Sequence, residues 1–430
     1  GATGFLSSTN DQNPPSLVFN NGEPYVYGVN GFSFNNTKTT VMKFDGNNWV
    51  AVGQASLPVG TVRYPRITID SGTIYISFQD YDYNEGVSVM TFDGQSWSYL
   101  GQRGFCNGIC RFTSIAVYNG EPYVVFEDNS YSFEATVMKY NGSNWVYVGN
   151  PGFSAGYSKG QAYLSYITFD DSIPYVSFLN AGPFIPPVLI NNEIGVMKYD
   201  GNNWVGVGNS TFSVGVVPFG PIDIYNGEPY LAYNDSLSDY KAVVRKFDGA
   251  NWVPVGPVEF SAGTASFPQI VLHNGVPYVC YIDLGNSSKA TVMYYNGASW
   301  IPLGGSPGFT QGAIANPIMR LDGGTIFITY IDSLSSTGPL SAMSYDIATS
   351  LETIEKASNN FTIDPNPVSN LLNISTTNNI QSLAVLGMNG QVIKRFSASK
   401  QINVSDLPQG VYVLEVKTEI GWGYKQFVKH

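Results

Sequence analysis

Histidine and cysteine are scarce in this chain. Its 430 residues include only two histidines, His273 and His430, and three cysteines. Catalytic triads and histidine-rich zinc sites need more histidine than this, so the sequence disfavours most hydrolases that use them. Three cysteines are too few for a disulfide framework. Cys106 and Cys110 nevertheless share the short loop FCNGIC, where we expect either a local bridge, as suits an exported protein, or two free thiols.

Charged residues are also few, and the basic ones are in the minority. They make up 12% of the chain, with 32 acidic against 21 basic residues and a formal net charge of −11. Because nucleic-acid affinity comes largely from Lys and Arg neutralising phosphates, DNA and RNA are poor candidate partners. No run of about 18 apolar residues occurs, so an integral membrane protein is not expected. The start GATGF lacks an initiator Met and a leader, which indicates that a signal peptide has been removed.

Turn formers and aromatic residues are abundant, and they recur with a regular period. The chain has 46 Gly, 25 Pro and 14% aromatic residues, a composition typical of all-β proteins with many tight turns. One phrase, FDGNNWVAVG in its first copy, recurs every 48 residues with a single interval of 59. Its tryptophans are Trp49, Trp97, Trp145, Trp204, Trp252 and Trp300. A second phrase, best seen as NGEPYVVFED, occurs seven times.

Each repeat predicts four short antiparallel strands. Asn-Gly and Asp-Gly pairs between alternating apolar runs indicate hairpins, because both central residues of a type I′ turn need positive φ. A four-stranded meander of about 48 residues is the size of one propeller blade. Residues 1–350 therefore predict a seven-bladed β-propeller rather than a solenoid. The tryptophans are expected to pack between blades, the alternative being that they stack on sugar rings.

Two departures from the repeat are candidate binding sites. Arg63 and Arg111 hold the same register in neighbouring repeats, nine residues before the turn glycine, and Arg66 is close by. Such a cluster could receive a carboxylate or sulfate of an acidic polysaccharide; the alternative is ordinary salt bridges to neighbouring acids. The fourth repeat carries an apolar insertion at 181–193, including Phe184 and Ile185. It is either a partner-binding finger or a loop folded over its own blade.

Acidic or amide residues end the second strand of every repeat. Most are expected to cap the following turn by accepting backbone N–H bonds. The segment DYDYNEG offers alternate oxygens from Asp80, Asp82 and Asn84, which makes it a calcium candidate, but it departs from an EF-hand loop at the turn position. No other cofactor is expected. With Asp in every repeat, no pair of glycosidase carboxylates can be singled out, so the sequence predicts a propeller that is not an enzyme.

The repeat stops at 357–360, and a different pattern covers 361–430. The phrases FTIDPNPVSNLLNI, VLGMNGQVIKRF, INVSDLPQGVYVLEV and YKQFVKH alternate apolar and polar residues between turn signals. This pattern predicts a small antiparallel β-sandwich, joined to the propeller by a linker at 351–360.

These phrases resemble, in the same order, the type A C-terminal sorting domain of the type IX secretion system. The matching positions are Pro365, Asn366, Pro367, Asn389, Gly390, Leu407, Gly410, Tyr412, Lys425 and Lys429. The resemblance implies export through the periplasm and an outer-membrane translocon, and removal of the domain by a sortase-like peptidase. It also implies O-glycosylation where Asp-Ser precedes an apolar residue. Ser172, Ser236 and Ser333 are then acceptors, or else ordinary turn serines.

The sequence thus predicts an exported all-β protein, secreted or held at the cell surface. Its propeller is expected to bind an extracellular glycan or protein ligand as a binding or adhesion module. One alternative is a secreted polysaccharide-active enzyme built on the propeller scaffold. Another is an accessory subunit that docks on a larger surface machine.

Overall fold

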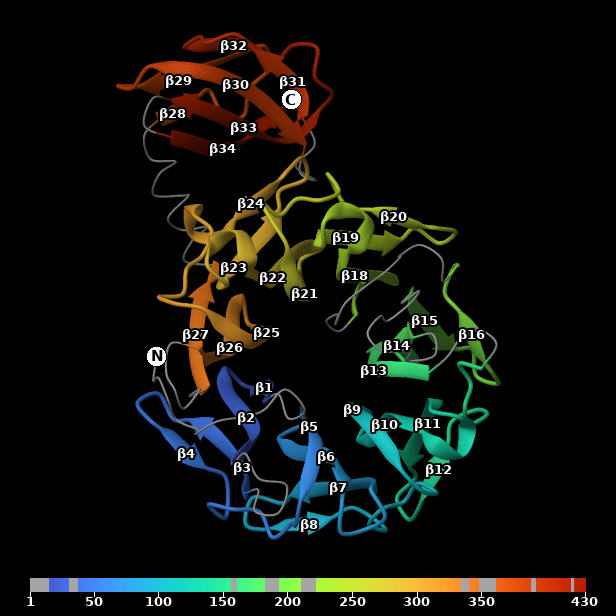
Figure 1. The fold of residues 1–430 in the computed structure, drawn as a ribbon. Coiled ribbons are helices and arrows are strands. Elements are labelled where there is room, and N and C mark those ends of the chain that lie inside the picture. Colours follow the sequence, from blue (N-terminus) through green and yellow to red (C-terminus); the bar gives the residue numbers. More distant parts are fainter. Residues whose placement is uncertain are drawn as a thin grey trace. The chain divides into compact units, whose positions relative to one another are not determined.

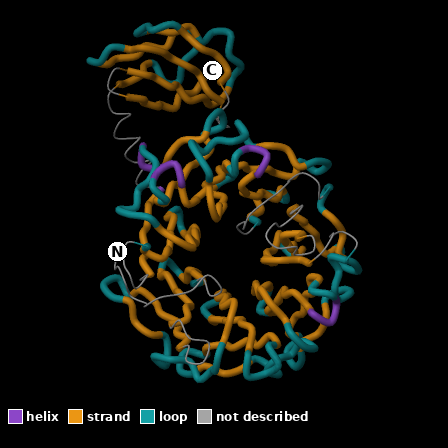
Figure 2. Tube along the Cα trace, viewed as in Figure 1, coloured by secondary structure: helices purple, strands orange, loops and turns teal. Residues whose placement is uncertain are grey.

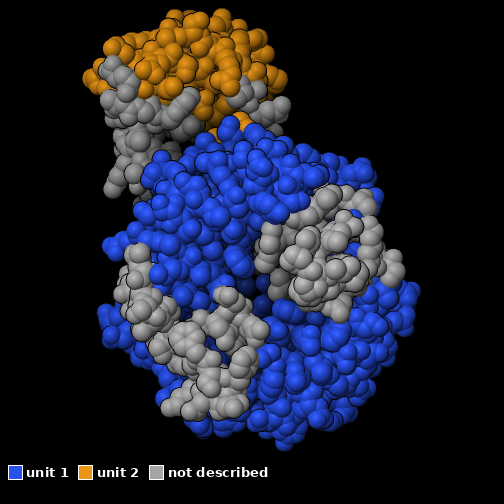
Figure 3. Space-filling model, in the orientation of Figure 1, with its two compact units in different colours: residues 1–295, 299–344 blue, residues 296–298, 345–430 orange. Residues whose placement is uncertain are grey.

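The computed structural model describes residues 15–30, 38–155, 161–181, 193–209, 222–333, 340–347, 361–387, 392–418 and 421–430. It confirms the predicted all-β fold, built from three- and four-stranded antiparallel sheets (Figure 1). The chain divides into two compact units, residues 1–295 with 299–344 and residues 296–298 with 345–430 (Figure 3). The predicted linker at 351–360 lies outside the described residues, so those boundaries stay predictions.

Seven sheets in which strand order follows the sequence form the first unit, so each repeat is a meander. The first four blades are β1 (Ser16–Asn20), β2 (Glu23–Asn30), β3 (Lys38–Phe44), β4 (Trp49–Ala51); β5 (Val62–Asp70), β6 (Thr73–Asp80), β7 (Gly86–Phe92), β8 (Trp97–Tyr99); β9 (Cys110–Tyr118), β10 (Glu121–Asp128), β11 (Glu134–Tyr140), β12 (Trp145–Tyr147); and β13 (Gln161–Asp170), β14 (Ile173–Ala181), β15 (Glu193–Tyr199), β16 (Trp204–Gly206). The other three are β17 (Asp223–Tyr225), β18 (Glu228–Asp235), β19 (Lys241–Phe247), β20 (Trp252–Pro254); β21 (Ala265–His273), β22 (Val276–Asp283), β23 (Lys289–Tyr295), β24 (Trp300–Pro302); and β25 (Ile314–Asp322), β26 (Thr325–Asp332), β27 (Leu340–Asp346). Short 3₁₀ turns occur at η1 (Asn129–Tyr131), η3 (Ser236–Ser238), η4 (Leu284–Asn286) and η5 (Leu303–Gly305).

The two hairpin turns of a blade differ, although the sequence predicts the same type for both. Between the first and second strands, Asn21 and Gly22 have φ of 51° and 82°, as a type I′ turn requires. Between the third and fourth strands only the glycine has positive φ. Here Asp45 Oδ1 accepts hydrogen bonds from the backbone N–H groups of Asn47 and Asn48 at 2.9 and 2.8 Å, which keeps the pKa of the carboxyl below its usual range. The aspartate side chain therefore stabilises this turn, and a second positive φ is not needed.

Tryptophans join neighbouring blades, as predicted. The Trp145 indole Nε1 donates to Leu100 O at 2.9 Å in the preceding blade, and its ring stacks on Phe105 with centroids 4.2 Å apart. Four other tryptophans make the same bond to the blade before them: Trp97 to Val52, Trp204 to Val148, Trp252 to Val207 and Trp300 to Val255. A buried indole needs a partner for its N–H, so these residues serve blade packing rather than sugar stacking.

The last blade contacts the first, which closes the ring (Figure 2). The rings of Phe19 and Phe327 lie 4.1 Å apart, and Asp322 Oδ2 accepts a hydrogen bond from Gly22 N at 2.9 Å. Leu17 and Leu340 share one buried cluster across this junction. Each sheet thereby buries both faces against neighbours, and the predicted propeller is confirmed over the competing solenoid.

The second unit is the predicted two-sheet sandwich. One sheet contains β28 (Phe361–Asp364), β29 (Leu371–Thr376) and β32 (Gln401–Asn403), and the other contains β31 (Val392–Phe396), β30 (Ile380–Gly387), β33 (Gly410–Thr418) and β34 (Gly421–Lys429). Several motif residues support this packing. Asn366 Oδ1 accepts from Val428 N at 2.9 Å, the Tyr412 hydroxyl donates to Pro408 O at 2.9 Å, and Leu407 lies in the core. Pro365 and Pro367 flank Asn366, and Lys425 and Lys429 lie on β34, whereas Asn389 and Gly390 lie outside the described residues.

A disulfide joins Cys106 to Cys110, the first residue of β9, so the structure contains the bridge and not a pair of free thiols. Both cysteines are buried in one cluster with Val87 and Phe126. We expect Cys106→Ser/Cys110→Ser to lose roughly 2 kcal/mol of unfolding free energy, by the chain-entropy relation for so short a loop. Thermal melts with and without reductant measure this. Reductant should lower the Tm of the wild type and leave the variant unchanged; equal responses would contradict the prediction.

Candidate active site

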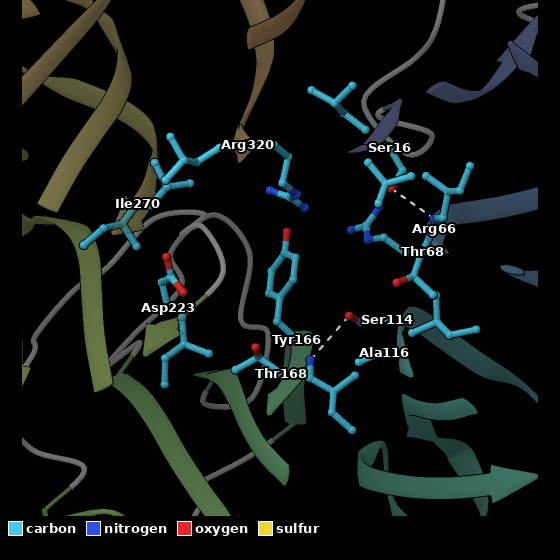
Figure 4. A pocket seen from close by; sticks show the side chains of 18 of the residues that line it. Ser16, Arg66, Thr68, Ser114, Ala116, Tyr166, Thr168, Asp223, Ile270 and Arg320 are labelled. Atoms are coloured by element: carbon cyan, nitrogen blue, oxygen red, sulfur yellow. Dashed lines mark hydrogen bonds between the residues drawn. The ribbon is translucent and has the colours of Figure 1, made fainter. Parts of the chain in front are cut away.

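A cavity of about 480 Å³ lies in the channel of the propeller (Figure 4). Its walls come from the first strand of every blade: β1, β5, β9, β13, β17, β21 and β25. These strands have a sheet neighbour on one side only, so backbone groups of their other edge need partners. Ser16 Oγ accepts from Ile67 N at 3.1 Å and Ser114 Oγ from Ile167 N at 3.3 Å. Serine hydroxyl groups of one blade thus accept hydrogen bonds from backbone N–H groups on the unpaired strand edge of the next blade.

A repeated bulge positions side chains in this cavity. In β5 the residues Tyr64 and Pro65 lie opposite one residue of β6, and Tyr64 has φ of 53°. Strand β13 has a bulge at the same place in its pairing with β14. The residue after the bulge is Arg66 in β5 and Tyr166 in β13. Because a bulge redirects the side chains that follow it, these two residues meet at one level of the channel.

Four polar residues from four blades converge in the cavity: Arg66, Tyr166, Asp223 and Arg320. Figure 4 shows the Tyr166 hydroxyl directed toward the Arg320 guanidinium, with the Arg66 guanidinium beside it. Arg66 Cζ is 5.6 Å from the centre of the Tyr166 ring. Arg66 Nη1 donates to Pro65 O at 3.0 Å and Arg320 Nη1 to Met319 O at 2.8 Å. A guanidinium has several further N–H donors, so the pair is suited to an anionic ligand.

Burial shifts two of these groups toward their neutral forms. It lowers the pKa of Arg320, and Arg66 lowers it further, while Tyr166 and Asp223 oppose the shift. Burial also raises the pKa of Asp223 to about 6, although its carboxylate accepts backbone hydrogen bonds from Leu272 N at 2.7 Å and Ile224 N at 2.9 Å. Asp223 therefore changes charge close to neutral pH, within electrostatic reach of Arg320.

The structure divides the three predicted arginines between two places. Arg66 lines the cavity, whereas Arg63 and Arg111 lie before the bulges of β5 and β9. Arg63 stacks over Tyr81 at 4.7 Å and Arg111 over Phe133 at 4.6 Å.

Tyr166, Asp223 and Arg320 are absent from the sequence predictions. A usable signal was present, because Asp223 and Arg320 sit four residues before their turn glycines. Val18, Ala116 and Val271 hold that register in other blades. A charged residue there departs from the repeat as clearly as Arg63 does.

Asp80 of the calcium candidate forms an ion pair in the structure. Arg103 Nε and Nη2 donate to the two carboxylate oxygens of Asp80 at 3.0 and 3.1 Å, and Ser88 Oγ adds a bond of 2.7 Å. The guanidinium competes with a cation for both Asp80 oxygens, and calcium binding by Asp80, Asp82 and Asn84 stays a prediction. Within the described residues no group of three potential metal-ligating side chains occurs.

The other expectation for these acids was that they cap the following turn, and the structure shows this at Asp128 and Asp235. Asp128 accepts from Ser130 N and Asp235 from Leu237 N, each at 2.9 Å. At Asp283 no such cap forms, and its Oδ2 accepts from the Thr291 hydroxyl instead.

The remaining predicted sites lie away from the cavity. Phe184 and Ile185 are outside the described residues. Ser172 lies exposed in the turn between β13 and β14, Ser236 begins η3, and Ser333 follows β26. Their role as glycan acceptors stays a prediction.

Residues 362–430 match the family described as secretion system C-terminal sorting domain. The match confirms the predicted sorting domain, and with it export across the outer membrane to the cell surface or the medium. It also means that the type IX translocon handles the chain. In the part of the chain that the structure describes, no helix is both long and apolar enough to span a membrane.

Solved structures with a similar fold include polysaccharide lyases. An ulvan lyase bound to -[GlcA(1-4)Rha3S]- is 11% identical, with a TM-score of 0.55, and the match covers 80% of this chain and 95% of that one. The polysaccharide lyase Uly1 is 8% identical, with a TM-score of 0.51 and coverage of 79% and 91%. No curated protein sequence matches. The expectation of a non-enzymatic propeller is therefore wrong: it assumed that chemistry needs histidines or an acid pair, and the lyases with this architecture contradict it.

Proposed function

We propose that the propeller is a secreted enzyme that cleaves an acidic polysaccharide by β-elimination. The observation that carries the proposal is the Tyr166 hydroxyl directed toward the Arg320 guanidinium inside the channel, with the Arg66 guanidinium beside it (Figure 4). The fold of the ulvan lyase and of Uly1 supports the assignment to polysaccharide cleavage.

Elimination at a uronic acid needs a group that holds the carboxylate and a group that moves one proton. Arg66 and Arg320 supply the first, because bidentate N–H donation binds the carboxylate and stabilises the charge that builds on it as the C5–H bond breaks. Tyr166, as the phenolate, takes the C5 proton. The electron pair forms the C4=C5 double bond, the C4–O bond breaks, and Tyr166 returns the proton to the leaving oxygen. No water is consumed, and the enzyme ends as it began.

Hydrolysis by two carboxylates fits this cavity less well. Glycosidases use an acid and a base or nucleophile on opposite sides of the bond. Among the described residues that line the cavity, Asp223 is the only carboxylate, and it is bonded to two backbone N–H groups.

The decisive experiment separates elimination from hydrolysis. The full chain is incubated with ulvan, polygalacturonate and alginate, and the products are examined by ultraviolet absorbance and mass spectrometry in ¹⁸O-labelled water. Elimination gives products that absorb through the C4=C5 bond and carry no label. Labelled products without this absorbance would replace the lyase with a hydrolase, and the absence of any cleavage would refute the proposed function.

The pH dependence of substrate binding should follow Asp223. Below its pKa of about 6 the carboxyl is neutral; above it, the negative charge offsets the arginines and repels an acidic polymer. We expect KM to rise roughly three- to tenfold as the pH increases through this value. Asp223→Asn should remove the rise. Asp200→Asn is the control, because backbone hydrogen bonds keep the pKa of this exposed turn residue low. An unchanged pH profile in Asp223→Asn would exclude this role.

A further inference from the structure

We propose that Arg63 and Arg111 form a second anion-binding subsite, here called the arginine rim, which holds another acidic sugar of the same polysaccharide chain. The inference rests on the proposed function, since it describes how a polymer reaches the cavity. It concerns residues outside the set that lines the cavity.

The two arginines of the rim both lie near Tyr64. Both guanidinium groups oppose the rise in the pKa of Tyr64 that burial causes, so both lie within electrostatic reach of its hydroxyl. The rings of Tyr64 and Phe112, each at the bulge of its strand, lie 4.3 Å apart. Thr113 Oγ1 donates to Tyr64 O at 3.0 Å, which ties β9 to β5. Neighbouring blades thus bring the two charges to one place.

Within the described residues, Arg111 takes part in none of the salt bridges. Its partner across the β9–β10 pairing is Glu127, whose side chain is 0% exposed. Neither carboxylate oxygen of Glu127 has a hydrogen-bond partner, and burial holds the pKa of this acid well above its usual value. A buried carboxyl without partners favours its neutral form, so Glu127 offsets little of the charge of Arg111.

Aromatic stacking holds the two guanidinium groups. Arg63 lies over Tyr81 and Arg111 over Phe133, and Arg63 pairs across the sheet with neutral Gln79. A guanidinium stacked on a ring is held by its face, and its several N–H donors lie in the plane of the group. Arg63 also hydrogen-bonds to the Tyr64 hydroxyl. This arrangement suits the bidentate binding of a carboxylate or sulfate.

The rim and the cavity lie along one line of the channel. Arg63 precedes Arg66 by three residues on β5, roughly 10 Å in an extended strand and somewhat less with the bulge. A single sugar ring does not span this distance, whereas a short oligosaccharide does. At the other end of the inner strands lie Asp70, Asp170 and Asp322, which repel a polyanion. The acidic polymer is therefore expected to enter from the rim.

The test compares binding with cleavage. Binding of polygalacturonate and of dextran sulfate is measured by calorimetry for the full chain and for Arg63→Gln/Arg111→Gln. Lys241→Gln/Lys289→Gln is the matched control, because it removes two positive charges from third strands of other blades. Arg63→Lys/Arg111→Lys keeps the charge without the bidentate geometry. We expect affinity about a hundredfold weaker in the Gln variant, unchanged in the control and intermediate in the Lys variant.

The outcomes separate the subsite from the enzyme. In one outcome the wild type binds the polymers, the Gln variant binds them more weakly, and no substrate is cleaved. The rim then stands, and the proposed function fails. If cleavage occurs but KM for polymer is the same in the Gln variant and the control, the rim is overturned and the enzyme stands. A wild type that binds neither polymer overturns the rim. Circular dichroism of each variant shows whether it is folded.

Discussion

Tyr166→Phe should lower the rate of polysaccharide cleavage by about 10²- to 10⁴-fold, the contribution of a positioned proton-transfer group. The substitution removes one oxygen and leaves the ring beneath Arg66 in place. The carboxylate-binding groups Arg66 and Arg320 are untouched, so affinity for the polymer should stay the same. The measurement is the initial rate of C4=C5 absorbance together with calorimetric binding of the same substrate.

The control for Tyr166 is another tyrosine of an inner strand. Tyr225 ends β17 and is not among the residues that line the cavity. Tyr225→Phe should therefore keep the wild-type rate. If Tyr166→Phe retained more than about a tenth of the rate while binding normally, proton transfer would belong to another group.

Trp204→Ala should lower the free energy of unfolding by about 3 to 5 kcal/mol. The indole is 8% exposed and stacks on Phe153 with centroids 4.3 Å apart. Its Nε1 donates to Val148 O at 2.8 Å, so the substitution also leaves a buried carbonyl without this donor. Urea denaturation of the full chain, followed by tryptophan fluorescence and circular dichroism, measures the loss.

Two further variants separate ring packing from the hydrogen bond. Trp204→Phe keeps an aromatic ring and loses the N–H, so we expect a smaller loss of roughly 1 to 2 kcal/mol. Trp49→Ala removes the only repeat tryptophan that is not buried, and it should cost less than Trp204→Ala. Equal losses for Trp49 and Trp204 would contradict the view that burial between blades sets the effect.

Most of the fold could be predicted because its information is local. The spacing of Trp49, Trp97 and Trp145 marks each blade. Asn21-Gly22 marks a turn because the turn requires positive φ at both residues, which few residue types adopt readily. The C-terminal motifs were recognisable for the same reason, since Asn366 and Tyr412 recur at set places in a domain family. The second turn was misjudged because the Asp45 side chain replaces a backbone conformation, which spacing does not reveal.

The candidate site, in contrast, depends on closure of the ring. Arg66, Tyr166 and Arg320 come from three blades and lie 100 or more residues apart in sequence. Nothing near any one of them indicates the other two. The sequence was enough to group Arg63 with Arg111, because they share a register in adjacent repeats. It did not reveal that both lie apart from Arg66.

The sequence alone determined the number of blades, the all-β class, the Asn-Gly turn between the first two strands and the export tail, since each follows from residues within one repeat or one motif. Tertiary structure alone decided which side chains meet in the channel and which acids keep their charge. Asp80 pairs with Arg103, whereas the carboxylate of Glu127 lies buried without a hydrogen-bond partner, although each is one of the last two residues of a second strand. The physical reason is that burial and charge pairing depend on neighbours from other blades, and closure of the ring sets those neighbours.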